Sequence, residues 1–175
     1  LTMIKSAVII PTGDEIRSGI VLDTDSPEVM RNLLIYNPEM HVTRFSPVND
    51  DENSINNTVL FASSSADLII LIGGSGGGHR FSPTLSKDFT HTVLERVLSP
   101  KTDSKLFGKN GHLWCRLICG KLGESLVINL PGPFVEAQAA IKAFCETAET
   151  NDIYKINNAM AQAVKAQYPQ GAEIK

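Results

Sequence analysis

The segment best suited to bind an anion is a run of glycines that directly follows an apolar stretch. Residues 73–78 contain five glycines and one serine, and His79 and Arg80 come next. Without side chains, backbone N–H groups can close on an anion, and the N-terminus of a following helix adds to the attraction. We therefore predict an anion-binding loop, with a flexible surface loop as the alternative. Its candidate binding residues are Gly73, Gly74, Ser75, Gly76, Gly77, Gly78, His79, Arg80 and Ser82.

This glycine run departs from two common nucleotide-binding motifs. A P-loop requires Lys and then Ser or Thr after the last glycine, where this chain has His79 and Arg80. The dinucleotide fingerprint requires a glycine three residues after Gly76, and His79 stands there. The predicted loop is therefore an anion site of another kind.

Acidic residues follow the first predicted strand. The stretch Thr12-Gly13-Asp14-Glu15 holds two adjacent acids, and Asp23 and Asp25 come shortly after it. One or two carboxylates together with phosphate oxygens can hold Mg²⁺, but solvated turn acids explain the same spacing equally well. For Asp51, the favoured interpretation is the start of a helix, where acids complement the helix dipole.

A histidine and two cysteines have a spacing that superficially suggests a metal site. On a strand, His112 and Cys115 point to opposite faces, and Cys115 and Cys119 lie too far apart to share one ion easily. We expect buried thiols instead, and Cys145, at helical spacing from Ile141, is expected in the core as well.

Three apolar segments are predicted strands that end in Gly- or Pro-rich turns. Residues 6–10 lead into Pro11, residues 67–72 lead into Gly73, and residues 125–129 lead into Pro131-Gly132-Pro133. Because ligands bind outside the carboxyl ends of parallel strands, we expect the three turns to meet at one edge of the sheet. The candidate binding residues of the first and third turns are Thr12, Gly13, Asp14, Glu15, Pro131, Gly132 and Pro133.

The remaining segments complete an alternating pattern of helices and strands. Ser26 as N-cap with Pro27 is expected to begin one helix, and residues 101–111 are expected to form a polar loop. Residues 112–119 should pair with 125–129 as an antiparallel hairpin. The pattern predicts the α/β class, as a three-layer α/β/α fold with a mostly parallel sheet and an antiparallel edge hairpin. We expect a single domain over residues 1–175, with a core at about 5–145 and a C-terminal helix at about 151–167.

Composition narrows the classes of partner. The 175 residues carry a formal net charge of −3 and no basic stripe, which argues against nucleic acid as the main partner. The apolar runs are far shorter than the ~20 residues that a membrane span needs. Three cysteines in apolar segments, with no signal-peptide layout at the start, favour a reduced cytoplasmic location.

Several of these motifs, taken in order, resemble one family. They are Thr12-Gly13-Asp14-Glu15-Ile16, Gly19-Ile20 with Asp23-Thr24-Asp25-Ser26, Asp50-Asp51-Glu52, residues 67–76, and Asn129-Leu130-Pro131-Gly132. This constellation resembles the molybdopterin-binding domain family of MoaB/Mog type, which also recurs in molybdenum-insertion proteins of MoeA/gephyrin type. The family has a Gly-x-x-x-Asp-x-Asn stretch where this chain carries Asp23 and Asp25.

The resemblance implies both a ligand and an activity. Loops at the strand ends of a three-layer α/β fold would bind a pterin and its phosphate, with the glycine run around the phosphate and Pro131-Gly132 along the pterin pocket. Active relatives use Mg²⁺ and ATP to adenylylate molybdopterin, or insert molybdate, and Asp51 would match one of their active-site acids. After its glycine turn the family usually shows Arg-Asp-x-Thr-Pro, and Arg80 occupies the place of that catalytic acid here. A guanidinium in that place removes a metal ligand and adds an oxyanion-binding group.

Four hypotheses follow. The first is a domain that binds molybdopterin or the finished molybdenum cofactor by its phosphate, in a positively biased hollow with Arg80, for cofactor maturation or delivery. The second is a molybdopterin adenylyltransferase or molybdenum-insertion enzyme, with Asp51 and Asp14 as catalytic residues and Asp14, Glu15 and Asp51 collecting Mg²⁺ for ATP. The third is a CinA-like nucleotide pyrophosphatase, and the fourth is an assembly module with a vestigial pocket. The resemblance also implies a homo-oligomer, a trimer or dimer, with the apolar C-terminal helix as a candidate contact.

Overall fold

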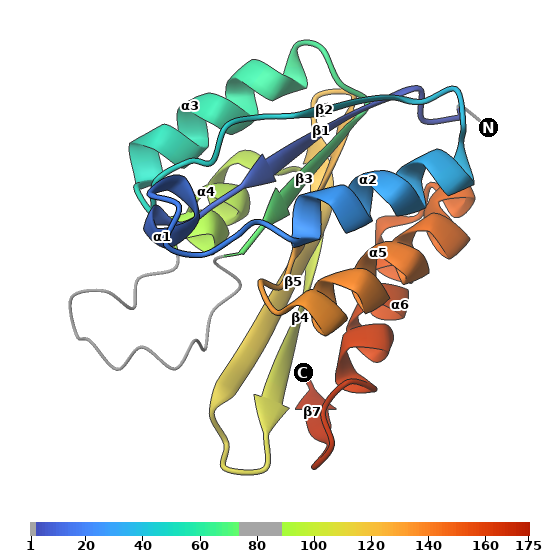
Figure 1. The fold of residues 1–175 in the computed structure, drawn as a ribbon. Coiled ribbons are helices and arrows are strands. Elements are labelled where there is room, and N and C mark those ends of the chain that lie inside the picture. Colours follow the sequence, from blue (N-terminus) through green and yellow to red (C-terminus); the bar gives the residue numbers. More distant parts are fainter. Residues whose placement is uncertain (1–2, 74–88) are drawn as a thin grey trace.

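The computed structural model describes residues 3–73 and 89–175, and this part of the chain forms one mixed sheet between two layers of helices (Figure 1). The sheet has the strand order β2-β1-β3-β6-β5-β4-β7. Its strands are β1 (Ser6–Pro11), β2 (His41–Arg44), β3 (Leu68–Ile72), β4 (Lys101–Gly108), β5 (Leu113–Leu122), β6 (Ser125–Leu130) and β7 (Ala172–Ile174).

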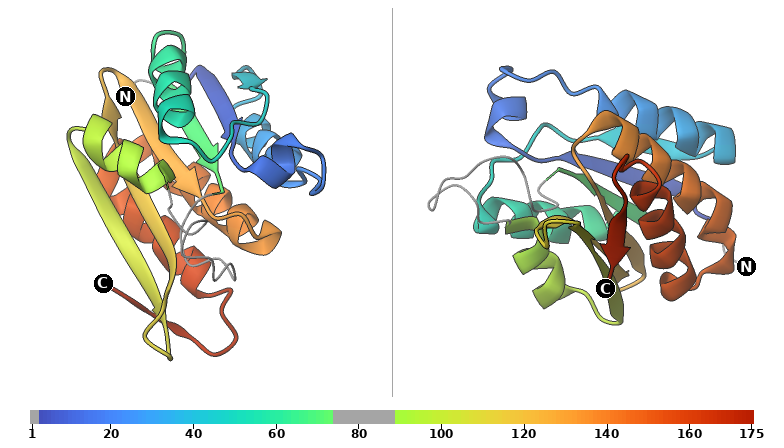
Figure 2. Two further views of the ribbon diagram at one scale, coloured as in Figure 1. Left: turned by 90° about the vertical axis from the view of Figure 1, so that its left-hand side faces the viewer. Right: turned by 90° about the horizontal axis from the view of Figure 1, so that it is seen from below.

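The helices cover both faces of the sheet, as the two views in Figure 2 show. Helices α2, α5 and α6 pack on one face, and α3 and α4 pack on the other. The helices are α1 (Asp14–Arg17), α2 (Asp25–Tyr36), α3 (Glu52–Ser63), α4 (Phe89–Val97), α5 (Phe134–Thr147) and α6 (Ile153–Lys165), with a short 3₁₀ turn at Ala148–Thr150. The predicted three-layer α/β/α class is confirmed.

The four strands β2, β1, β3 and β6 run parallel to one another. Strand β5 is antiparallel to β6, which confirms the predicted hairpin, and β4 and β7 extend the antiparallel part of the sheet beyond it. The carboxyl ends of β1, β3 and β6 therefore lie side by side at one edge.

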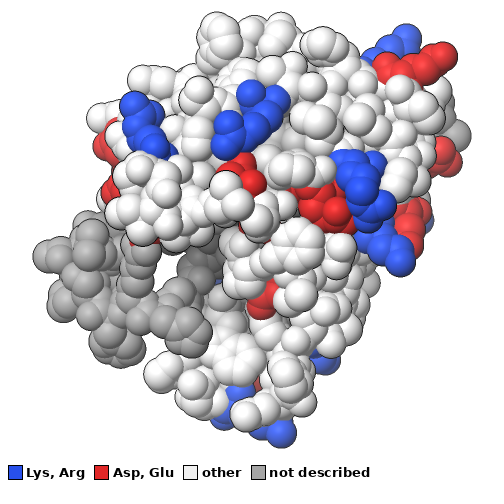
Figure 3. Space-filling model, viewed as in Figure 1, with Lys and Arg blue, Asp and Glu red and all other residues white. Residues whose placement is uncertain are grey.

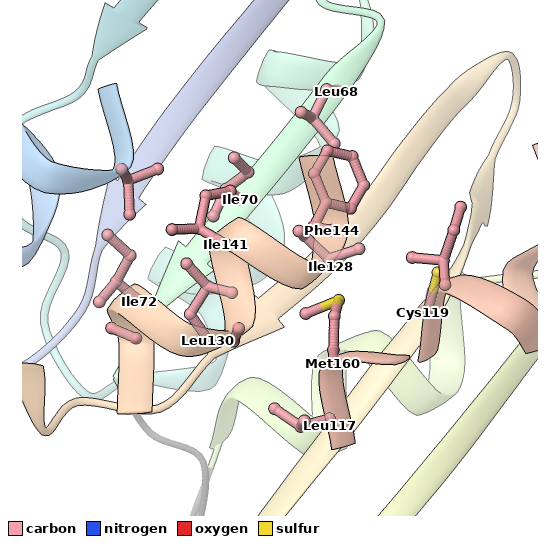
Figure 4. Close-up of a cluster of buried hydrophobic side chains, with 14 of the residues drawn as sticks. Leu68, Ile70, Ile72, Leu117, Cys119, Ile128, Leu130, Ile141, Phe144 and Met160 are labelled. Carbon is pink, nitrogen blue, oxygen red and sulfur yellow. The ribbon is translucent and has the colours of Figure 1, made fainter. Parts of the chain in front are cut away.

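The packing of the core explains why the sequences of the central strands are continuous apolar runs. All five residues of β3 are buried, because helices cover both faces of that strand. On one face, β3 and β6 contact Ile141 and Phe144 of α5, while Met160 of α6 packs over the part of the sheet nearer β5 (Figure 4). Cys115 and Cys119 are buried in this same cluster, as expected, and Cys145 is half-buried.

The prediction of a polar loop at residues 101–111 is wrong, because residues Lys101–Gly108 form strand β4. Exposed Lys101, Asp103 and Lys105 alternate along it with buried Ser104 and Leu106. The buried Ser104 hydroxyl donates to the side chain of Asn157 on α6, so a polar residue is satisfied inside the core. A strand with one solvated face and one polar inner residue carries too weak an apolar pattern to be recognised from its sequence.

Two smaller corrections concern the start of α2 and the polar tail. Helix α2 begins at Asp25 with Thr24 as N-cap, not with Ser26, and the Asp23 carboxylate accepts from the Ser26 N–H at 3.0 Å. The polar tail after Gln167 contributes the edge strand β7. The apolar face of α6 is buried within the chain, through Ile156, Met160 and Val164 among others, and a contact between subunits stays a prediction. None of the described helices is long and apolar enough to span a membrane.

Candidate ligand-binding site

Three strand ends meet at the predicted edge of the sheet. The Thr12 N–H donates to the Ile72 carbonyl at 2.9 Å, and the Gly73 N–H donates to the Leu130 carbonyl at 3.0 Å. A Cβ atom on Gly132 would lie 3.9 Å from the Gly73 Cα atom. The prediction that these turns share one edge is confirmed for the described residues.

Gly73 occupies a position that requires glycine. Its φ of 91° lies in a region that side chains disfavour, and a Cβ atom there would lie 3.1 Å from both the carbonyl oxygen and Oγ1 of Thr12. The Thr12 hydroxyl donates to the Ile72 carbonyl at 2.9 Å and is buried. Thr12 and Gly73 therefore hold the ends of β1 and β3 together, and the glycine run starts from a fixed point.

A second chain segment joins this edge from the far side of β1. Thr12 bridges to Val48 in parallel, and the Gly13 N–H donates to the Val48 carbonyl at 2.9 Å. Asp14 Oδ1 then accepts from the Asp50 N–H at 3.1 Å. These bonds place the start of α1 against the segment that leads into α3, although about 35 residues separate them in the chain.

A shallow hollow of about 550 Å³ lies between these two segments. Asp14 and Asp51, which the sequence analysis proposed as a pair, both line it, whereas Glu15 is not one of the residues that form it. Pro131, Gly132 and Pro133 lie beside Gly73 at the end of β6, outside this hollow. Its lining residues are Asp14, Arg17, Ser18, Asn49, Asp50 and Asp51.

Asp51 has the structural role that its position indicated. It is the N-cap of α3, and its Oδ2 accepts from the N–H and the hydroxyl of Ser54 at 2.8 and 2.6 Å. The hydrogen bond from the Ser54 side chain has the largest effect, and together these bonds lower the pKa of the Asp51 carboxyl. Asp51 is therefore charged at neutral pH.

The positive bias expected from Arg80 stays a prediction, because that residue lies outside the described part of the chain that forms this hollow. Three aspartates and a single arginine line it, so its balance is acidic. Carboxylate and amide oxygens suit Mg²⁺, but in the described chain no three His, Cys, Asp or Glu side chains are grouped to hold a metal by themselves. Mg²⁺ here would need further oxygens from a bound phosphate.

Several predicted residues lie outside the described part of the chain. They are Gly74, Ser75, Gly76, Gly77, Gly78, His79, Arg80 and Ser82, and their assignment to an anion site stays a prediction. Conversely, sequence reasoning missed Arg17, Ser18 and Asn49. Arg17 follows Asp14 by three residues, and on even one turn of helix that spacing places two side chains on the same side. That spacing was the available signal.

A second hollow, of about 380 Å³, lies on the other side of α1 and is mainly apolar. Its charged lining residues are Asp23 and Arg44. Arg44 Nε donates to Asp23 Oδ2 at 3.0 Å. Burial raises the pKa of Asp23, but hydrogen bonds from Ser26 and Arg44 outweigh it, and the net pKa is lowered. Met30 of α2 and Leu22 form part of its apolar wall.

Comparison with solved structures shows where this fold recurs. MoaB from Thermus thermophilus, a molybdopterin biosynthesis enzyme, has a TM-score of 0.65 at 19% identity, covering 89% of this chain and 98% of that one. MogA has a TM-score of 0.64 at 22% identity, covering 86% and 99%. CinA from Thermoplasma acidophilum has a TM-score of 0.56 at 20% identity, covering 84% and 97%. At these identities the likeness concerns the fold.

A sequence model of one family matches most of the chain. It is described as a probable molybdopterin binding domain and matches residues 8–150, which include all three strand ends of the candidate site. No curated protein sequence matches this chain significantly. The family model covers well over half of the 175 residues, and the chain therefore belongs to the molybdopterin-binding domain family.

Proposed function

We propose that this domain binds molybdopterin, or the finished molybdenum cofactor, at the edge where β1, β3 and β6 end, and serves the biosynthesis or delivery of that cofactor. The observation that carries the proposal is the junction of Thr12, Gly73 and Gly132 in a chain of this family. At Gly73 a side chain would press against Thr12, so glycine is needed there, and the carboxyl ends of parallel strands are where such sheets bind ligands.

The proposal assigns the phosphate to the glycine run and to Arg80. A guanidinium binds phosphate through two parallel hydrogen bonds, and backbone N–H groups provide further donors. Arg80 and residues 74–78 lie outside the described chain, so this assignment rests on the sequence.

Two measurements test the proposal. Mass spectrometry of small molecules released from the purified protein should detect a pterin that carries a phosphate. In calorimetry with molybdopterin, Arg80→Glu should abolish binding, because it places a negative charge against the phosphate. The control is Arg31→Glu, at an exposed position of α2 where Arg31 pairs with Glu28. Wild-type affinity in Arg80→Glu would contradict the role of Arg80, and no pterin binding by the wild type would contradict the function.

The acidic hollow favours a second candidate, adenylyl transfer to molybdopterin. Asp14 and Asp51 line the same hollow, and one or two carboxylates with phosphate oxygens are the usual environment of protein-bound Mg²⁺. These two residues would hold Mg²⁺, which would neutralise the phosphate charge of ATP. The carboxylates would then fix the position of the nucleotide relative to the pterin phosphate.

Product formation distinguishes this candidate from simple binding. Molybdopterin, ATP and Mg²⁺ incubated with the protein should yield adenylylated pterin and pyrophosphate. Asp51→Asn should lower the yield strongly, because the amide keeps an acceptor for the N-cap of α3 but loses the charge. The control is Asp152→Asn, at the N-cap of α6. Absence of product with the wild type would exclude adenylyl transfer and leave the binding proposal standing.

A further inference from the structure

Arg17 is distinguished from the other described arginines by its lack of an ion pair. Arg31, Arg44, Arg96 and Arg116 each pair with at least one carboxylate. On the face drawn in Figure 3, basic and acidic side chains likewise lie in small mixed groups. Among the described residues, Arg17 forms no ion pair, although three aspartates line the same hollow.

The position of the Arg17 guanidinium is nevertheless defined. Its Nη1 donates to the Pro47 carbonyl at 3.2 Å, and the Arg17 backbone N–H donates to the Gly13 carbonyl at 3.0 Å. One bond uses one of the five N–H donors of a guanidinium. The side chain is exposed and lines the hollow, so donors remain for a group that enters it.

Two of the neighbouring aspartates, Asp14 and Asp51, accept hydrogen bonds from donors other than Arg17. Asp14 Oδ1 accepts from the Asp50 N–H, and Asp51 Oδ2 accepts from Ser54. A phosphate that entered this hollow would meet carboxylate charges on most sides and would be repelled. Arg17 is the one positively charged residue that lines the described hollow, so it can offset this repulsion.

We propose that Arg17 determines the specificity of this hollow by binding a phosphate group of the ligand. This inference rests on the proposed function, since it assigns a second phosphate contact to the same sheet edge. The planar guanidinium fork matches two phosphate oxygens. The shared chemistry is a phosphate ester, and it has two sources: the monophosphate of molybdopterin and the polyphosphate of a nucleotide held with Mg²⁺.

Calorimetry with two ligands tests the proposal and separates the two sources. Molybdopterin is titrated into one sample, and ATP with Mg²⁺ into the other, for the wild type, Arg17→Gln and Arg17→Lys. Arg17→Gln should weaken one or both ligands by roughly tenfold to a hundredfold, the range for loss of a hydrogen bond to a charged group. Arg17→Lys should recover part of the affinity, because it keeps the charge without the fork. Weakening of molybdopterin alone assigns Arg17 to the pterin phosphate, and weakening of ATP alone assigns it to the nucleotide.

Two controls exclude a merely structural effect. Arg31→Gln removes an exposed arginine of α2 and should leave both affinities unchanged. The thermal unfolding midpoint of Arg17→Gln should equal that of the wild type, since its bond to Pro47 is exposed. The affinity of the wild type should also fall with added salt more steeply than that of Arg17→Gln.

The possible results of these titrations distinguish failure of the Arg17 inference from failure of the proposed function. Wild-type affinity of Arg17→Gln for both ligands would overturn the inference and leave the binding of molybdopterin intact. A wild type that binds ATP but no molybdopterin would overturn the proposed function, and the ATP titration would still decide the role of Arg17. A wild type that binds neither ligand would overturn both.

Discussion

The least expected residue of the structure is Asp25, the first residue of α2. It is only 8% exposed, its Oδ1 has no hydrogen-bond partner among the described residues, and Asp23 lies nearby. Asp23 itself is paired with Arg44. Burial, and then the charge of Asp23, raise the pKa of Asp25 to about 7. This buried carboxyl is therefore close to half-protonated at neutral pH.

Asp25→Asn should consequently stabilise the protein in alkaline solution. The pKa of Asp25 is about 7 in the folded chain against an ordinary value of 3.8, so folding opposes its ionisation. The stability of the wild type therefore falls as the pH rises from about 4 to about 7, and the loss is complete above that range. The neutral amide escapes this loss. Thermal unfolding should show a higher midpoint for Asp25→Asn at pH 8, by a few degrees for each ~1 kcal/mol gained, and little difference at pH 4.

The matched control is Asp152→Asn at the start of α6. Asp152 is half-buried and caps its helix with two hydrogen bonds to its carboxylate, so its replacement should give no gain that grows with pH. Parallel pH profiles for wild type and Asp25→Asn would show that Asp25 is charged and stabilised in the folded chain. The family pattern of Asp-x-Asn at this place agrees with the expected tolerance for the amide.

At the scale of elements, Asn129 joins β6 to β5 where their regular pairing ends. The strand pairing runs from Leu122 and Ser125 to Cys119 and Ile128. Beyond it, the fully buried side chain of Asn129 accepts from the Ile118 N–H at 2.6 Å and donates to the Arg116 carbonyl at 2.9 Å. The amide thus replaces backbone bonds between β5 and β6 where their regular pairing has ended.

Asn129→Ala should therefore lower the free energy of unfolding by roughly 1–3 kcal/mol, since it leaves the Ile118 N–H without an acceptor. The Arg116 carbonyl keeps a partner, because it also accepts from His91 Nε2 at 2.8 Å. Urea denaturation measures the change. Asn110→Ala is the control, because Asn110 lies in the exposed turn between β4 and β5, where its Oδ1 accepts from the His112 N–H. A loss at Asn129 no larger than that at Asn110 would show that water or nearby groups replace the amide.

At the scale of the whole molecule, α6 completes the layer over the antiparallel half of the sheet. Its buried residues Ile156, Met160 and Val164 join the same core cluster as Leu106 of β4 and Leu117 of β5. Burial of each such side chain contributes about 1.5–3 kcal/mol. Because a whole domain is stable by only about 5–15 kcal/mol, the helix is indispensable to the fold.

A chain that ends at Thr150 should consequently lose cooperative folding, although it contains the whole predicted core of residues 5–145. Circular dichroism and chemical denaturation would show a non-cooperative transition. A chain that ends at Gln170 is the control, as it loses β7 but keeps α6. Cooperative unfolding of the shorter chain would show that residues 5–150 fold independently of α6.

Sequence patterns alone determined the parallel centre of this protein and the edge at which its turns meet. Strands buried on both faces are continuous apolar runs, and the glycines and prolines that end them mark where the backbone must turn. Residues 67–72 with Gly73, and residues 125–129 with Pro131, show this directly. The start of a helix at Asp51 could also be predicted from the sequence, because an N-cap side chain bonds the backbone of the residues that directly follow it.

Only the tertiary structure decided the course of β4 and the charge of the hollow. Strand β4 is recognisable through β5 and β7, which pair with its two edges, and through α6, which covers one of its faces and not the other. Likewise, Asp14 and Asp50 are neighbours because the bridge between Thr12 and Val48 brings distant segments together, and that same bridge places Arg17 among the aspartates. Local spacing reports on the residues of one turn or strand, whereas the environment of a side chain depends on long-range pairing, which no local pattern encodes.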